Sequence, residues 1–248
     1  MRKTSIWIAV LTLGYVLPVV QLQLIGGLLP GTSIYLAHFL DLAVNAPFFL
    51  IVLLSLFLAV RKESTSNTRT GRALLWLAAL FLLFFFEGHG IHFAANSVSS
   101  LINHDSGPPE LLELTYFYDE ILGHYMLMFG QAGLLYVLML YEAAAENAKP
   151  CSRLESVLII LCGLVAGITV ALILLEGQFA ILGVVSFVAV WATAVATGVH
   201  RGWFNKRPFA MYMAAMTLTT VAGLILWAWR YKALVEPLAR PFRMWMGG

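Results

Sequence analysis

Charged residues are scarce in this chain. Of its 248 residues, 11% are Asp, Glu, Lys or Arg and 60% are hydrophobic, whereas an average soluble domain carries about 25% charged residues. The basic residues are scattered at the ends of apolar segments, so nothing in their distribution suggests a nucleic-acid partner. The longest polar connections have only about 12 to 18 residues, which is too short for a separate soluble domain.

Cysteine is equally rare, with Cys151 and Cys162 as its two occurrences. Their number and spacing provide neither a disulfide framework nor a metal-binding motif. The sequence also lacks a glycine-rich phosphate loop, the Gly-x-Ser-x-Gly elbow of serine hydrolases and the His-Glu-x-x-His of zinc proteases. Any chemistry must therefore come from other groups, and the histidines and acids are the natural candidates.

Long hydrophobic runs dominate what the chain does contain. A helix that spans a bilayer needs about 20 apolar residues, and we find seven such runs. We therefore predict a single domain over residues 1–248, an all-α polytopic membrane helix bundle. Its spans are expected at about residues 6–27, 34–60, 73–98, 115–141, 156–175, 178–200 and 208–230. The division around Gly177 is a minimal turn, and if spans five and six are one helix the bundle has six spans.

Positive charge predicts the orientation of these spans, because cytoplasmic segments are enriched in Lys and Arg. With a cytoplasmic N-terminus, the outer loops between spans hold no Lys or Arg. The inner segments then hold all 15 basic residues except those of the C-terminal part, Arg230, Lys232, Arg240 and Arg243. The short loops favour the bacterial inner membrane as the location.

Ionisable residues gather near the outer ends of three consecutive spans. Two of these spans carry a polar stripe with i, i+3, i+7 spacing, which is one face of a helix. The stripes are His38, Asp41 and Asn45 in the second span, and His89, His92 and Asn96 in the third. Gln21, near the end of the first span, is available to hydrogen-bond across helices. Polar groups from neighbouring helices are therefore expected at one depth.

The fourth span adds a third stripe. Glu120 and His124 are spaced i, i+4, and Asp119 lies one position around the helix from them. Glu87 is about half a turn from the face of His89, so either it points at a different helix or the flanking Gly88 and Gly90 mark a local distortion. Of the six histidines, His200 is alone at the inner side. Because ionisable groups inside a bilayer are costly, such a concentration indicates a functional site.

The residue types favour a metal site, because imidazoles and carboxylates that converge from several helices suit Zn or Fe. Helix bundles commonly build such sites in their cores. We predict that Zn²⁺ is bound by His89, His92 and His124, with His38 as a substitute for one of them. Fe is the alternative ion.

The same pattern predicts a chemical role for the acids. A bound metal ion activates water, and Asp119 or Glu120 would take the proton as general base. Asp41, Asn96 and Glu87 would hold the ligands in place by hydrogen bonds. Since the cluster lies in a bundle surrounded by membrane lipids, the leading hypothesis is a metal-dependent hydrolase of lipid amides or esters.

At His92 and Asp119-Glu120 the sequence resembles the CREST superfamily of seven-helix membrane hydrolases, which includes the alkaline ceramidases and the progestin/adiponectin-type receptors. In that family a His near the end of one span and an Asp at the start of the next accompany His-x-x-x-His in the last span, and three histidines hold zinc. The resemblance implies that His92 is a zinc ligand and Asp119 an acid near the bound water. The last span here has no histidine, so His124, His89 or His38 would replace that pair.

Two other classes of protein use the same residue types. A b-type haem or quinone-linked redox protein would ligate haem through two histidines, here His124 with His38, His89 or His92. A non-enzymatic carrier, sensor or assembly factor would use the polar network to move protons or to hold helices together.

Overall fold

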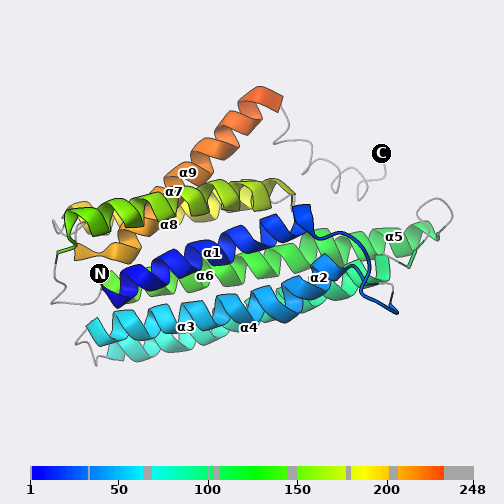
Figure 1. Cartoon of the computed structure of the whole chain (residues 1–248), viewed down its shortest axis with the longest axis horizontal. Coiled ribbons are helices and arrows are strands. Elements are labelled where there is room, and N and C mark those ends of the chain that lie inside the picture. The colour runs from blue at the N-terminus through cyan, green and yellow to red at the C-terminus, as the bar shows by residue number, and fades with distance from the viewer. Residues whose placement is uncertain are drawn as a thin grey trace.

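The computed structural model describes residues 2–32, 34–63, 69–99, 101–102, 107–143, 150–176, 180–200 and 206–231. Within these ranges the chain is almost entirely helical and contains no strand. The protein is thus an all-α bundle, as its apolar runs predict, and Figure 1 shows most of its helices side by side along one axis.

The helical elements lie close to the predicted spans. In chain order they are α1 (Lys3–Leu24), α2 (Leu36–Leu40), η1 (Asp41–Asn45), α3 (Ala46–Glu63), α4 (Arg69–Ser99), α5 (Pro109–Tyr116), η2 (Phe117–Gly123), α6 (His124–Ala143), α7 (Arg153–Glu176), α8 (Ala180–His200) and α9 (Pro208–Tyr231). The η elements are π-helical turns that join their neighbours into continuous rods. The elements therefore make seven rods. The alternative of a single helix for spans five and six is wrong, because α7 and α8 fold back beside each other (Figure 1).

Six of the rods are long and apolar enough to cross a membrane. They are Lys3–Gln21, Leu36–Lys62, Gly71–Ser99, Pro109–Ala143, Arg153–Leu175 and Pro208–Arg230. Large apolar side chains also cover the outside of the bundle, where Trp76 is 80% and Trp229 79% exposed. Helices that are hydrophobic all round need an apolar environment, so these features are consistent with an integral multi-pass membrane protein.

The two ends of the bundle differ in which connections they hold. The start of α1 lies at one end, on the left of Figure 1, together with the end of α3 and the start of α4. The opposite end carries α2, α5 and the C-terminal part of α4. We call it the cluster end, because the polar residues singled out from the second, third and fourth spans lie toward it.

The rods α4 and α6 touch through their backbones at glycines. A Cβ atom at Gly88 would overlap the backbone of Leu127 and lie 2.8 Å from the carbonyl oxygen of Gly123. A Cβ at Gly130 would overlap the backbone of Phe85. Small residues of this kind allow helices to approach closely in membranes. Gly88 is therefore a point of close approach between the two helices, whereas Gly90 is exposed and has nothing within 4 Å of its Cβ position.

A second glycine contact joins α7 to α9. A Cβ at Gly163 would lie 2.6 Å from the carbonyl oxygen of Tyr212, and one at Gly167 would overlap the carbonyl of Met216. These glycines are spaced i, i+4, the Gly-x-x-x-Gly arrangement of closely packed membrane helices. Tyr212 and Met216 are fully buried there, so α7 and α9 form a firmly packed pair beside the polar rods.

A buried carboxylate joins α6 to α9 at the end of the bundle opposite the cluster. Glu142, 4% exposed, accepts hydrogen bonds from the backbone N–H groups of Phe209 at 3.0 Å and Ala210 at 2.9 Å. The first N–H groups of a helix have no partner within the helix, and a negative charge is favourable there. Glu142 thus caps α9 from another helix.

The glycine contact between α4 and α6 makes a prediction about stability. Gly88→Ala should lower the free energy of unfolding by about 1–3 kcal/mol, because the added methyl group has no room between the two backbones. Gly90→Ala is the matched control on the same helix and should be neutral or stabilising by up to about 1 kcal/mol. Unfolding in detergent, followed by circular dichroism, measures both. Equal effects of the two substitutions would contradict the packing described above.

The cap on α9 makes a second prediction. Glu142→Ala should lower the free energy of unfolding by about 1–3 kcal/mol, because it leaves buried N–H groups of α9 without their acceptor. The same substitution at Glu113, an exposed acid on α5, is the control and should leave the unfolding midpoint unchanged. If Glu142→Ala also left the midpoint unchanged, the carboxylate would not be stabilising α9.

Candidate metal centre

The polar stripes of three rods meet around one cavity at the cluster end. The cavity has a volume of about 280 Å³, and its walls come from α1, α2, η1, α3, α4, η2, α6 and α7. Its polar lining includes His38, Asp41, Asn45, His89, His92, Asn96, Asp119, Glu120 and His124. The sequence predicts these stripes at one depth, and the fold brings them to the wall of one cavity.

Two π-helical turns carry the acids of the cavity. Asp41 opens η1, and Asp119 and Glu120 lie in η2. In η2 the backbone N–H of His124 bonds to the carbonyl oxygen of Asp119, five residues earlier, so residues five apart are stacked. In an ordinary α-helix Asp119 would lie to one side of His124. The π-turn instead brings these two residues together.

Local sequence accounts for one of these turns. Pro47 follows η1 by two residues and has no N–H, and its ring crowds the carbonyl of the residue four positions earlier, which widens the helix there. At the end of η2 the chain passes close to α4, since a Cβ at Gly123 would lie 3.0 Å from the backbone nitrogen of His92. Turns of this kind are frequent at functional sites.

One group of side chains converges closely enough to hold a metal ion. A ligand atom from each of His92, Asp119 and His124 lies within 4.8 Å of the other two. Nδ1 of His92 is 2.5 Å from Oδ1 of Asp119, and the rings of His92 and His124 are 4.5 Å apart between centroids. Among the described residues it is the one group of three or more His, Cys, Asp or Glu side chains that meets this criterion.

Three further polar side chains surround this group. Glu120 Oε2 lies 3.2 Å from Nδ1 of His124. Asn96 donates to Asp119 Oδ1 at 3.1 Å and lies 3.2 Å from Nε2 of His92. The ring of His38 is 6.4 Å from that of His92, so His38 faces the same space without joining the converging group.

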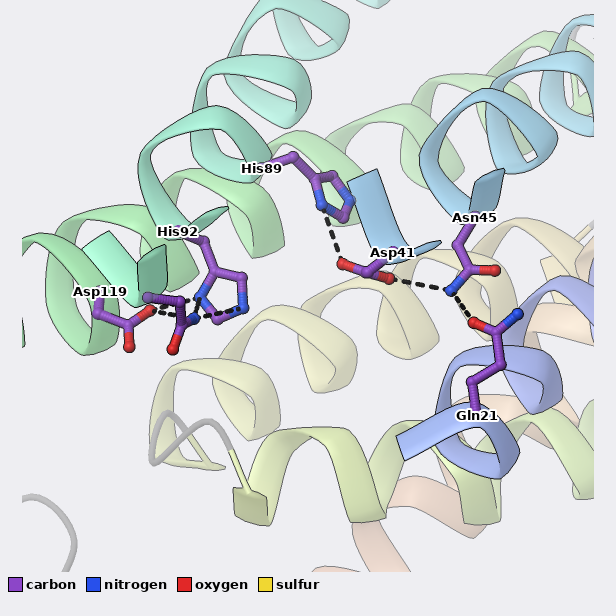
Figure 2. Close-up of polar contacts among 7 residues, drawn as sticks. Gln21, Asp41, Asn45, His89, His92 and Asp119 are labelled. Atoms are coloured by element: carbon purple, nitrogen blue, oxygen red, sulfur yellow. Dashed lines mark hydrogen bonds and ion pairs between the residues drawn. The ribbon is translucent and has the colours of Figure 1, made fainter. Parts of the chain in front are cut away.

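His89 points to a different partner. Its Nδ1 lies 3.4 Å from Oδ2 of Asp41, and Asp41 accepts a 3.1 Å hydrogen bond from the amide of Asn45. Asn45 also donates to Gln21 of α1 at 2.6 Å, which confirms that Gln21 bonds across helices. Figure 2 shows this chain running from His89 toward α1, away from the contact of His92 with Asp119.

The cavity excludes one residue that the sequence suggests and includes three aromatic residues that it does not. Glu87 is exposed and does not line the cavity, because two residues rotate a helix by more than half a turn from His89. Tyr15, Phe49 and Phe85 do line it. Nothing in the sequence distinguishes these aromatic residues from the many others that only pack.

The converging donors fit a metal ion. Two imidazoles and one carboxylate form a common catalytic zinc set and also the set that binds non-haem Fe(II). Both kinds of site keep positions open for water or substrate, and here the donors line a cavity. Asn96 supplies a supporting hydrogen bond to Asp119 of the kind that metal ligands usually have, and the carboxylate of Glu120 lies 3.2 Å from His124. The group therefore has the donor chemistry of a site that binds metal and leaves room for a reactant.

Comparison with known proteins adds no assignment: no family model, curated protein or solved structure matches this chain. The resemblance to the CREST superfamily stays a prediction that rests on His92 and Asp119-Glu120.

Asn96 allows a test of how the site is supported. Asn96→Leu keeps the branching and number of side-chain heavy atoms but removes the amide that contacts Asp119 and His92, so the affinity for Co²⁺ should fall by about 10- to 100-fold. Titration of the detergent-solubilised protein with Co²⁺, followed by its visible absorption, measures the affinity. Glu87→Gln on the same helix should leave it unchanged. An unaltered affinity in Asn96→Leu would remove Asn96 from the site.

Proposed function

We propose that this chain is an integral membrane metalloenzyme that hydrolyses amide or ester bonds of membrane lipids. The ion is Zn²⁺, with Fe as the alternative, and its ligands are His92, His124 and Asp119. The single observation that carries the proposal is the convergence of these three side chains within 4.8 Å of one another in the wall of a cavity.

The contacts of the two neighbouring acids favour roles other than the general base predicted from sequence. Asp119 is 2.5 Å from His92 and belongs to the converging group, which suits a ligand. Glu120 lies 3.2 Å from Nδ1 of His124, which suits a carboxylate that orients a ligand imidazole. Zinc in such a site polarises a carbonyl group and activates water.

The setting supports a lipid substrate. The cavity lies among rods whose outer surfaces are apolar, and its lining combines these polar groups with Phe49, Phe85 and Leu127. Pockets for small molecules are mostly apolar with a few polar groups that fix orientation. We place the N-terminus in the cytoplasm, on the distribution of Lys and Arg. The cluster end then faces the outer leaflet, and lipid molecules of that leaflet are the nearest source of amide and ester bonds.

The ring geometry disfavours a haem held between His92 and His124. Two axial histidines bind a haem iron from opposite faces of the macrocycle. The rings of His92 and His124 instead lie 4.5 Å apart with 39° between their planes, which leaves no space for a macrocycle between them.

The proposal is tested by metal content and absorbance measured on one sample. Protein purified in detergent without an affinity metal should contain about one Zn or Fe per chain and show no Soret band. His92→Ala combined with His124→Ala should lose the ion, and Glu87→Gln should retain it. Metal that persists in the double variant would refute this ligand set, and a Soret band would favour the haem protein.

Activity is measured on the same preparations. Mixed micelles of ceramide, phosphatidylcholine and phosphatidylethanolamine are incubated with the protein, and released fatty acid is quantified by mass spectrometry. Release should depend on the bound ion and fall by more than about 100-fold in the double variant. Equal release by wild type and double variant would show that this site does not hydrolyse these lipids.

A further inference from the structure

A second polar group lines the same cavity beside the converging ligands. We call it the His89 chain, and it consists of Gln21, Asn45, Asp41 and His89. Its members come from α1, η1 and α4, and they are linked by contacts of 2.6, 3.1 and 3.4 Å. All four line the cavity (Figure 2), so the chain borders the space that a substrate would occupy.

The hydrogen bonds of this chain fix the orientation of Asp41. The amide nitrogen of Asn45 donates to Oε1 of Gln21 and to Oδ1 of Asp41, and Asn45 is only 7% exposed. One oxygen of Asp41 is therefore held by Asn45, and the other faces Nδ1 of His89. A carboxylate accepts hydrogen bonds and does not donate them, so the proton of a neutral His89 belongs on Nδ1.

Nε2 of His89 is then left as a free base. His89 is 8% exposed, and its ring packs edge-on against Phe85 at 4.7 Å. No hydrogen bond to Nε2 occurs within the described ranges of the chain, and the residue borders the cavity. A buried imidazole whose Nδ1 is held by a carboxylate, in a residue that lines a cavity, is the arrangement by which proteins orient a histidine for proton transfer.

We propose that His89 is the acid–base residue of this site, held in the active tautomer by Asp41, and that it is not a metal ligand. The inference rests on the proposed function and names the group that Asp119 and Glu120 leave unassigned. Asp41 and Asn45 are positioning residues that act through His89. Asp41 also interacts electrostatically with His92, so the two polar groups are close neighbours.

The proton balance of the hydrolysis is simple. Water attacks the carbonyl carbon of the lipid and passes its proton to Nε2 of His89 as the new C–O bond forms. The C–N bond of an amide, or the C–O bond of an ester, then breaks, and the same proton moves from Nε2 to the leaving amine or alcohol. His89 returns to its starting state, and no oxidant or additional reactant is needed.

The competing explanation is that the His89 chain only holds helices together, as polar side chains in membrane proteins do. Modification with diethyl pyrocarbonate distinguishes the acid–base role of His89 from a purely structural role, because this reagent acylates an unprotonated, accessible imidazole nitrogen. The experiment can be done before the substrate is known. The rate of modification of each histidine is followed by peptide mass spectrometry, on the full-length protein in detergent, with and without saturating Zn²⁺. A residue that is only structural has no reason to react faster when its carboxylate partner is present.

The expected result separates His89 from the ligands. His92 and His124 should react slowly with Zn²⁺ bound and faster without it, whereas His89 should react in both states. Asp41→Asn, which keeps the shape but not the charge, should slow modification of His89 by about tenfold or more, because the tautomer is no longer fixed. Asp41→Glu should restore part of the rate. Glu87→Gln is the matched control and should behave like wild type.

The remaining outcomes each decide a claim. Protection of His89 by Zn²⁺ would make it a ligand, and absence of reaction in both states would show that Nε2 is not available; either result overturns the inference. A rate at His89 that Asp41→Asn does not change would overturn the role of Asp41. In the metal-free Asp41→Asn variant, an unchanged rate of modification at His124 shows that the variant is correctly folded. If His89 reacts as expected but Zn²⁺ protects neither His92 nor His124, the proposed metal site fails and the orientation of His89 by Asp41 stands.

Discussion

The close approach of α4 and α6 is the constraint on which the rest of this structure depends. Between helices that face lipid there is little hydrophobic driving force, so packing and polar contacts hold them together. At Gly88 the backbones of the two rods meet with no room for a side chain, and a Cβ at Gly123 would lie 3.0 Å from the backbone nitrogen of His92. That contact brings His92 of α4 against Asp119 and His124 of the facing rod. The packing that stabilises the pair is thus also what assembles the converging donors.

Each of three imidazoles in the cavity is paired with its own carboxylate through Nδ1: His89 with Asp41, His92 with Asp119 and His124 with Glu120. Ionisable groups are expensive inside a bilayer unless they are paired, and this arrangement reduces that cost. Through these pairs, each of the three histidines is joined to an acid within the cavity. Two of the pairs lie together, and the third is held toward α1 by Asn45, so one cavity contains two separate polar groups.

The acids at the other end of the bundle are used differently. Glu142 accepts two backbone N–H groups of α9, and Glu155 accepts the backbone N–H of Arg2 and the hydroxyl of Ser5 at 2.8 and 2.6 Å. Both are buried, at 4% and 6% exposure, and both join ends of helices. Acidic residues therefore join helix ends at one end of the bundle and line a cavity with histidines at the other. The presence of buried acids alone does not indicate a functional site, whereas their grouping with histidines around a cavity does.

The sequence by itself determined the rods and the stripes. Apolar runs of spanning length, broken by turns, fix where helices begin and end, and i, i+3, i+7 spacing puts His89, His92 and Asn96 on one face, because both properties are local. Tertiary structure alone decided the partners. Which acid meets which histidine depends on the rotation of neighbouring helices and on the π-turn that moves Asp119 beneath His124. For the same reason Glu87 lies outside the site, since a contact between two helices is a property of both and cannot be read from either one.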